Sequence, residues 1–567
     1  MDERWFSAWS IMLEAIAQWS VLSLALMGIG QLVRRLTKLD PVSSPLFSMW
    51  LGLGGLLMLS YVVHWFTGLA TLPVLIALGL TALSPLIKCF RPQVVKKFIN
   101  TAISNRIPIA LMISAIAWFA NKTIGSTENY DSYLYHLSLI DYFADSQLIP
   151  GIANLDTRLG LQSSIYNIAA VFQGALWGPQ GYRLANGFIV LLLIAESVIR
   201  FVQIKSRSPL PSDLIIIFGT PLLLGQITPN AENWITSPSP DTAGAVLLLV
   251  AFAYSFDAFQ TRNINDYSKA FILCSIAITF RPLAIFILIF LTLAFFAVIK
   301  NKEVPFTQAI RIATFSGLFL VSFLIHNWIT TGYFVYPTSL SLGNPSWKIP
   351  AELMTNDQKW VESWAKAPGL QPSEVLGNWN WFKPWLSANF RSFKPYLEVF
   401  IFGLLLNLLQ ANKNSEKYCK SSLFSIYSLT ALIVTGYFWL IRMPDLRFGW
   451  AVFIAIATFP LSVAIVRQGE SSAFALKASK LFLGVSVVLL IVNCTIGAAR
   501  PRLPVKHAER GFVEWTPKTQ LVTLPNGEKF VTPAETDQCG RVLLCTKLIA
   551  SDIRPYNVLG RTGYKND

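Results

Sequence analysis

Apolar and polar positions alternate in long blocks along this chain. Mostly apolar runs of about 17 to 25 residues, each long enough to cross the hydrocarbon core of a bilayer, are separated by polar connections. Because apolar residues do not alternate singly within the runs, the pattern predicts membrane helices and not barrel strands. About fourteen crossings are expected, at residues 9–33, 44–66, 70–88, 107–123, 184–204, 212–227, 242–260, 266–280, 282–300, 307–326, 395–410, 421–441, 448–466 and 480–498.

Composition agrees with an all-α polytopic membrane protein. Of the 567 residues, 53% are apolar and 14% are charged, which is too hydrophobic for a set of soluble domains. The net charge of +15 does not indicate a nucleic-acid partner, because the basic residues are spread over short loops. The start Met1–Arg4 lacks the features of a cleaved signal peptide, so the first apolar run is expected to stay in the protein.

Loop charges divide the connections between two faces. When the crossings are counted in order, the basic loops fall on one side, which the positive-inside rule assigns to the cytoplasm. The other face receives two long loops, 124–163 and 327–394, and the tail. We therefore expect a transmembrane domain at 1–499 and a small non-cytoplasmic domain at 500–567, in the inner (plasma) membrane. The apolar segment 164–178 is short, and the sequence leaves open whether it crosses.

Two carboxylates and an imidazole follow the fourth expected crossing: Glu128, Asp131 and His136. Ionisable groups close to a membrane span are costly, so they usually have a function. Apolar residues recur at near-helical spacing over 134–143, which predicts a helix lying in the membrane interface. Asp131 at its start could accept a proton from an incoming hydroxyl or, alternatively, cap the helix. Glu128, Asp131 and His136 are the candidate catalytic residues, and Arg158 in the same loop is a candidate for substrate binding.

A second acidic position follows two prolines. Ser237–Pro240 breaks the backbone, and Asp241 begins the next helix on the same face as Asp131. As a helix cap Asp241 needs no function. An acid on this face could also hold an acceptor hydroxyl or a partner arginine.

Cations also gather at helix ends on this face. They could form polar corners or reach lipid headgroups, or they could stabilise the charge of a phosphate leaving group. The candidate substrate-binding positions here are the cations Arg281, His326, Arg442 and Arg447, together with their neighbours Asn327 and Asp445.

The tail contains signals of a small outer α/β appendage. Residues 521–532 predict a hairpin with an Asn526-Gly527 turn. Cys539 and Cys545 follow, and a disulfide between them is chemically permitted outside the cell and would support a domain with little core.

Motifs for several other chemistries are absent from the sequence. There is no glycine-rich phosphate loop, no nucleophile elbow and no His or Cys cluster with metal spacing. No cofactor is firmly implied. Glu128 and Asp131 are an alternative, weakly signalled ligand pair for a divalent cation.

Four local sequences carry a family resemblance: Tyr130–His136, Pro150–Gly160, Ser237–Asp241 and Pro444–Phe448. From about residue 107 to the end, the chain resembles the GT-C class of integral-membrane glycosyltransferases, which includes protein O-mannosyltransferases and aminoarabinose transferases that modify lipid A. Asp131 matches the position of the catalytic acid of that class.

The resemblance implies a cell-envelope enzyme. The donor would be a polyprenyl-phosphate-linked sugar, the acceptor a glycan, lipid or protein, and transfer would invert the anomeric carbon at the periplasmic or exterior face. Two departures stand out. Many members carry paired acids one residue apart, whereas Glu128 and Asp131 are three apart. Three crossings in addition to the usual one precede the acidic loop, which suggests an added module.

Two alternatives to this interpretation remain. An envelope polysaccharide polymerase or O-antigen ligase would use the same type of lipid carrier in polysaccharide biosynthesis. A transporter or flippase of lipid-linked sugars predicts broken helices and ionisable residues deep in the apolar runs. The ionisable residues here crowd at one end of the helices, which disfavours transport.

Overall fold

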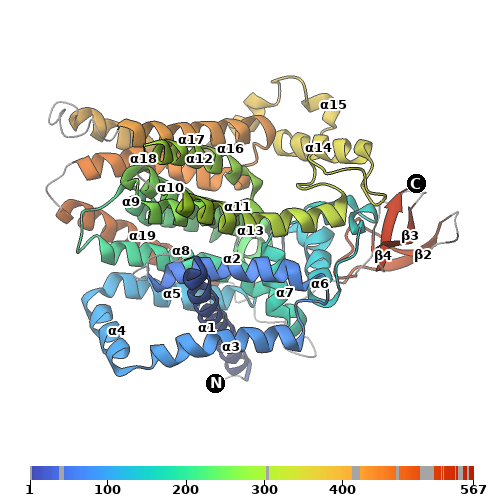
Figure 1. Cartoon of the computed structure of the whole chain (residues 1–567), viewed down its shortest axis with the longest axis horizontal. Helices are drawn as coiled ribbons and strands as arrows, with labels where there is room; N and C mark the ends of the chain where they lie inside the picture. Colours follow the sequence, from blue (N-terminus) through green and yellow to red (C-terminus); the bar gives the residue numbers. More distant parts are fainter. Residues whose placement is uncertain are drawn as a thin grey trace.

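The computed structural model is an all-α polytopic membrane protein with a small strand region at its C-terminus (Figure 1). The structure describes residues 3–37, 44–301, 305–410, 422–467, 472–498, 516–524, 527, 529–542, 545–546, 553–558 and 561–566.

Each of the fourteen expected crossings coincides with a helix. Among the described residues, ten helices are long and apolar enough to cross a membrane. They are α1 (Glu3–Thr37), α2 (Pro45–Val63), α3 (Leu72–Cys89), α8 (Leu184–Gln203), α10 (Pro240–Thr261), α12 (Ile285–Lys300), α13 (Phe306–Thr331), α16 (Phe382–Gln410), α18 (Leu446–Arg467) and α19 (Ser472–Ala498). The other four crossings correspond to α5 (Arg106–Lys122), α9 (Pro211–Ile227), α11 (Ile264–Phe280) and α17 (Ser422–Arg442).

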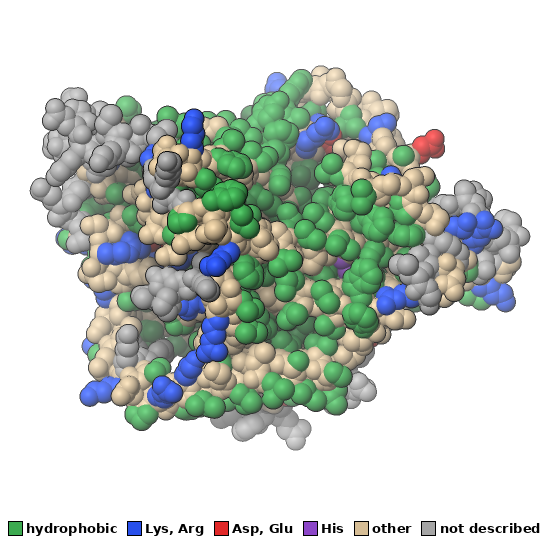
Figure 2. All heavy atoms as spheres, viewed as in Figure 1, with side chains coloured by type: hydrophobic (Ala, Val, Ile, Leu, Met, Phe, Trp, Pro, Cys, Tyr) green, Lys and Arg blue, Asp and Glu red, His purple; other side chains and the backbone are tan. Residues whose placement is uncertain are grey.

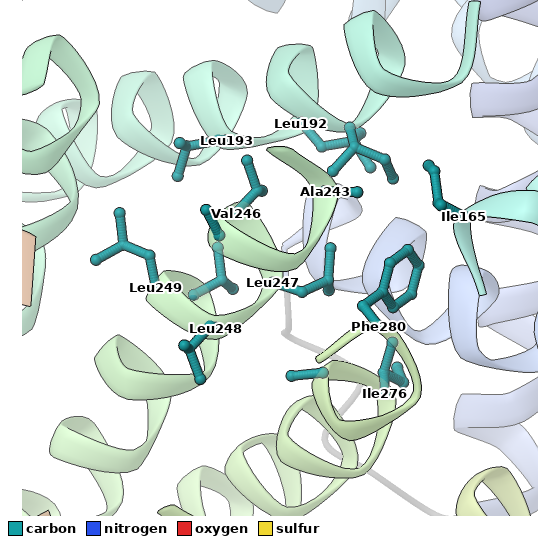
Figure 3. Packing of buried hydrophobic residues seen from close by; sticks show 14 of the residues in the cluster. Ile165, Leu192, Leu193, Ala243, Val246, Leu247, Leu248, Leu249, Ile276 and Phe280 are labelled. Carbon is teal, nitrogen blue, oxygen red and sulfur yellow. The ribbon is translucent and has the colours of Figure 1, made fainter. Parts of the chain in front are cut away.

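Helix α10 lies at the centre of the bundle. Its apolar window is completely buried, as expected for a helix that is hydrophobic on all sides. It packs against α8, α9, α11 and α18. Figure 3 shows Ala243 and Leu247 of α10 among Leu192 of α8 and Phe280 of α11. This packing places the start of α10, with Asp241, in the middle of one end of the bundle.

The first two helices pack against the rest of the bundle, and α3 packs against α1. Close packing of α1 and α2 depends on small residues, because a Cβ on Gly30 would lie 1.7 Å from the Ser48 carbonyl oxygen. Trp19 of α1 donates a hydrogen bond to the Leu184 carbonyl at 3.0 Å. Trp50 of α2 donates one to Glu196 of α8 at 3.1 Å.

Elements that do not cross gather mainly at one end of the bundle (Figure 1): α6 (Leu137–Asp145), α7 (Ile165–Gln173), α14 (Ala351–Lys366), α15 (Pro372–Val375) and the strands, whereas α4 (Pro92–Ser104) lies at the opposite end. The short apolar segment 164–178 contains α7, whose nine residues are all buried. A helix of this length spans only roughly 14 Å. The segment therefore does not cross a membrane.

The helix expected in the membrane interface lies inside the protein. A π-helical turn, Ser132–His136, continues into α6, and residues 137–144 are all buried. Its apolar side chains contact α7 instead of lipid. The sequence period was correct for a helix, but it could not tell which apolar surface would cover it.

The face of the bundle drawn in Figure 2 carries many apolar side chains. Figure 2 shows hydrophobic side chains over the middle of the helices, with Lys and Arg gathered toward the two ends. This distribution is the one expected for a chain that crosses a bilayer.

Two antiparallel hairpins form the C-terminal region. They pair β1 (Thr519–Thr523) with β2 (Lys529–Pro533), and β3 (Ile553–Val558) with β4 (Arg561–Asn566). The first is the expected hairpin; Gly527 has a positive φ of 87°, whereas Asn526 lies outside the described residues. The expected disulfide between Cys539 and Cys545 is present. The described residues from 516 onward thus form the strand part of the expected small C-terminal appendage.

A buried network of charged side chains joins α8, α9 and α10. Arg200 lies 2.8 Å from Glu196, 3.2 Å from Asp213 and 3.3 Å from Asp257. Tyr254 donates a further hydrogen bond to Glu196 at 3.0 Å. Because the charges are mutually paired, the low-dielectric interior tolerates them.

Candidate active site

Charged side chains from four separate segments meet at the start of α10. Arg447 Nη1 lies 3.7 Å from Asp131 Oδ2 and 3.5 Å from Asp241 Oδ2. Arg281 donates a hydrogen bond to Asp241 Oδ1, and Arg447 Nε donates one to Asp445 Oδ2 at 3.0 Å. We call Asp131, Asp241, Arg281, Asp445 and Arg447 the acid–arginine cluster. The structure thus brings together five of the residues singled out in the sequence.

Asp131 directly precedes the π-helical turn Ser132–His136. Its backbone N–H donates to Asn129 Oδ1 at 3.0 Å, and its carboxylate makes no capping hydrogen bond to the turn among the described residues. Capping therefore does not account for this acid. π-Helical turns often occur at functional sites, because they re-aim side chains within an otherwise regular helix.

Asp241 is held in place by its neighbours and is not the helix cap. Ser239 caps α10, since its hydroxyl oxygen accepts from the Asp241 N–H at 3.3 Å. Asn186 of α8 fixes the preceding turn by donating to the Ser237 and Ser239 carbonyls, both at 2.9 Å. The Asp241 carboxylate is thereby directed to the two arginines.

The two cations of the cluster lie near the same aromatic ring. The guanidinium carbons of Arg281 and Arg447 lie 4.6 Å and 5.1 Å from the centroid of the Phe448 ring. The negative ring faces attract both cations and so reduce their repulsion. A Cβ on Gly244 would come within 3.1 Å of Arg281 Nε, so the glycine one turn after Asp241 provides the space for Arg281.

Exposure divides the acids into an accessible one and a buried one. The Asp131 side chain is 32% exposed, whereas that of Asp241 is only 5% exposed. Burial raises the pKa of Asp131, and the charge of Arg447 opposes this shift. A reachable carboxylate with a raised pKa is a stronger proton acceptor than an ordinary aspartate.

Aromatic residues close the inner side of the cluster. Burial raises the pKa of the Tyr135 phenol, and the charges of Asp131 and Asp241 raise it further. Burial lowers the pKa of His136 to about 3, so this imidazole is neutral at physiological pH. The His136 ring lies 4.4 Å from Tyr135 and 5.5 Å from Tyr166, and its Nε2 has no hydrogen-bond partner among the described residues.

Arg158 and Glu128 lie at the edge of the site. The charge of Arg158 lowers the pKa of Asp131, against the larger effect of burial, and Arg158 Nη1 lies 4.0 Å from Asp156. Glu128 is exposed and accepts a hydrogen bond from Ser126 at 2.9 Å. Its backbone N–H donates to the Ser237 hydroxyl at 3.2 Å. Glu128 therefore joins the two acidic segments through its main chain.

Three predicted substrate-binding residues lie elsewhere. His326 is completely buried between His64 and Gln162, at 2.9 Å from each. Asn327 donates to the Phe334 carbonyl at 3.1 Å. Arg442 is 57% exposed and pairs with Glu362 at 3.0 Å. Although all three lie near helix ends, their side chains point to other partners.

The described part of the chain contains no preformed binding site for a divalent cation. No group of three or more His, Cys, Asp or Glu side chains there is arranged to hold a metal ion. The carboxylates of the acid–arginine cluster are instead paired with guanidinium groups.

Several residues of the site carry weak or no signals in the sequence. Tyr135 lies one helical turn after Asp131 and Phe448 directly follows Arg447, so helical periodicity and adjacency could have suggested them. Tyr166, Asn186 and Gly244 belong to apolar helices and carry no such signal. Only the packing of α7, α8 and α10 brings them to the cluster.

The fold and the cluster define a polytopic membrane protein with a charged site at one end of its helical bundle. The chain belongs to the family described as Domain of unknown function (DUF8201), whose model matches residues 12–454. No curated protein and no solved structure matches the chain. The matched range contains the whole acid–arginine cluster and also α2 and α3, so these helices belong to the family architecture.

Proposed function

We propose that this protein is a membrane glycosyltransferase of the GT-C type. It would transfer a sugar from a polyprenyl-phosphate donor to a hydroxyl of an envelope glycan, lipid or protein at the non-cytoplasmic face of the plasma membrane. The observation that carries the proposal is the accessible Asp131 carboxylate, 3.7 Å from Arg447, at the end of a membrane-crossing bundle. A lipid-borne donor and a water-soluble acceptor can both reach such a position.

In the proposed reaction, Asp131 accepts the proton of the acceptor hydroxyl. The acceptor oxygen attacks the anomeric carbon, and the bond from that carbon to the phosphate oxygen breaks. The polyprenyl phosphate leaves with the electron pair, and the configuration of the sugar is inverted.

The arginines would stabilise the leaving phosphate. Negative charge grows on the phosphate oxygens as the bond breaks, and fixed guanidinium donors bind such oxygens strongly. As Asp131 takes up a proton, its attraction for Arg447 falls, so Arg447 becomes freer to bind the phosphate. Asp241, buried between Arg281 and Arg447, keeps both cations in place.

The proposed orientation is supported by the loop charges. The basic connections counted in the sequence belong to the face opposite the acidic loop, and the positive-inside rule assigns that face to the cytoplasm. The cluster would then face the periplasm or the exterior, where lipid-linked sugars are used for envelope assembly.

A flippase for lipid-linked sugars is the second candidate. The network of Arg200 with Glu196, Asp213 and Asp257 favours it. These residues are buried near the helix ends opposite the acid–arginine cluster, and buried ionisable residues in membrane proteins often line a transport path. A flippase would move a labelled polyprenyl-phosphate sugar across proteoliposomes without forming a glycosidic bond. A polymerase or ligase would instead add preformed oligosaccharide blocks.

Asp131→Asn provides the direct test. Purified protein in proteoliposomes is given a panel of polyprenyl-phosphate sugars with envelope glycan, lipid and peptide acceptors, and the products are identified by mass spectrometry. We expect the wild type to form one glycosidic product and Asp131→Asn to lose it by at least about a hundredfold, since general-base catalysis contributes that much. Asp145→Asn, at an exposed acid of the same segment, is the matched control and should stay active. Full transfer by Asp131→Asn would refute the proposal.

A further inference from the structure

The C-terminal region touches the segment that carries Asp131. The Gly540 N–H donates to the Tyr133 carbonyl at 2.8 Å, and Gln538 Nε2 donates to the Tyr130 carbonyl at 2.9 Å. The two carbonyls flank Asp131 in the sequence. We call residues 537–541 the C-terminal clamp.

Side chains extend this contact along one face of the helical segment. Tyr130 donates its hydroxyl proton to Asp537, and Ser138 donates to the Gly540 carbonyl at 3.2 Å. Arg541 Nε donates to Asp141 Oδ2 at 3.0 Å. Positions 130, 133, 138 and 141 share a helix face, so the clamp holds the segment from before the π-helical turn to the middle of α6.

The clamp has its own covalent support. The disulfide between Cys539 and Cys545 closes a short loop that contains Gly540 and Arg541, and both cysteines are buried. Gly540 adopts a positive φ of 62°, a backbone conformation that residues other than glycine rarely adopt. A small appendage has little core, so a covalent bridge restricts the loop where hydrophobic packing cannot.

The ion pair of the clamp is largely removed from water. The Asp141 side chain is 11% exposed and that of Arg541 19%. Burial raises the pKa of Asp141, and the charge and hydrogen bonds of Arg541 oppose this shift. Arg541 Nη1 also donates to the Pro179 carbonyl at 2.6 Å, which ties α6 to the turn before α8. Loss of Arg541 would remove the cation that pairs with the mostly buried Asp141 carboxylate and leave the neutral Gln173 amide as a hydrogen-bond donor to it.

We infer that the C-terminal clamp is a positioning element of the candidate active site, which fixes the π-helical turn and so presents Asp131 to the acceptor. This inference rests on the proposed function of Asp131. The clamp lies outside the residues that the family model matches, so it adds a part to the site that the family range does not contain. A π-helical turn is less stable than a regular helix, and contacts from outside are therefore expected to decide whether it persists.

The first test measures the conformation of the segment without any substrate. Full-length wild type, Arg541→Ala and Arg541→Lys are compared in nanodiscs by hydrogen–deuterium exchange. We expect exchange across 130–145 to rise at least severalfold in Arg541→Ala, to rise less in Arg541→Lys, and to stay unchanged at the start of α10. Lys518→Gln is the matched control, because its exposed pair with Glu535 lies on the same appendage. Unchanged exchange in Arg541→Ala would overturn the inference.

The second test separates positioning from simple stability. With the donor and acceptor found for the wild type, Arg541→Ala should lower kcat by about tenfold to a hundredfold, as expected for a small misplacement of a catalytic group. KM for the donor should change less than twofold, and Arg541→Lys should recover part of kcat. Gln538→Ala, a milder change, should give a smaller loss of kcat if Arg541→Ala does not fold. Unchanged kcat in the folded variants would refute the positioning role, whereas full activity of Asp131→Asn would refute the proposed function instead.

Discussion

At the scale of single residues, Asp131 combines access to a substrate with partial burial. Its side chain is partly exposed, so a substrate can reach it, but burial of the rest raises its pKa against the pull of Arg447. Arg447 also serves Asp241 and Asp445 and cannot neutralise all three acids. Active sites commonly keep such imperfectly compensated charges at a cost in stability.

Replacing Asp131 by Asn should therefore not destabilise the protein at neutral pH. A carboxyl with a pKa raised by folding binds more protons in the folded state, so its ionisation above that pKa reduces stability. We expect the Tm of Asp131→Asn at pH 7.5 to equal or exceed that of the wild type. The difference should shrink as the pH falls from the raised pKa of the folded protein to the ordinary pKa of the unfolded chain, because below both values Asp131 is neutral in both states. Thermal unfolding in detergent across this pH range measures the effect, and a clearly lower Tm at pH 7.5 would contradict it.

Gly244→Ala tests the placement of Arg281. The added Cβ would lie 3.1 Å from Arg281 Nε, so the Arg281 side chain must move by a few tenths of an ångström, which changes its pairing with Asp241. We predict a loss of transfer rate of about tenfold with little change in Tm, since misplacement of a binding group affects the reaction more than folding. Gly225→Ala is the control, because no atom lies within 4 Å of its added Cβ. Equal rates for the two variants would argue against a role for Arg281.

At the scale of elements, hydrophobic run length predicted the crossing helices better than it predicted their ends. Helix α16 begins at Phe382, whereas its apolar part suggested residue 395. The additional residues, 382–394, contain three basic residues and one proline, which hide a helix from a hydropathy window. The helical period likewise predicted the segment that continues into α6. It did not predict that α7 and the C-terminal clamp pack against this segment.

We expect the network around Arg200 to be the main polar interaction that stabilises the packing of α8, α9 and α10. Arg200→Met should lower the free energy of unfolding by about 3–5 kcal/mol, because it leaves Glu196, Asp213 and Asp257 buried without their shared cation. Lys269→Gln, which breaks a more exposed pair with Asp266, should cost at most about 1 kcal/mol. Unfolding in SDS mixed micelles compares the two variants. Similar small losses for both would show that packing alone holds these helices.

At the scale of the whole molecule, the main prediction concerns orientation. We expect a cysteine introduced at Lys518, on the C-terminal appendage, to react with a membrane-impermeant maleimide added to intact spheroplasts. Cys89, exposed at the end of α3, should react only after the membrane is opened, since it lies beside the basic loops. Cys419 and Cys494 are first replaced by serine so that only the intended sites report. The reverse labelling pattern would place the acid–arginine cluster in the cytoplasm and exclude the proposed use of periplasmic donors.

The sequence by itself determined the membrane class, the positions of the crossing helices, the hairpin at β1 and β2 and the pairing of Cys539 with Cys545. These features depend on run length, turn residues and short spacings, all of which are local. Tertiary structure decided which charged residues meet. Loop charges could assign Asp131, Arg442 and Arg447 to one face, but a face is wide, and only the packing around α10 brings Arg447 to Asp131 while leaving Arg442 with Glu362. The contact of Tyr130 with Asp537 spans 407 residues, and no local pattern encodes a contact of that separation.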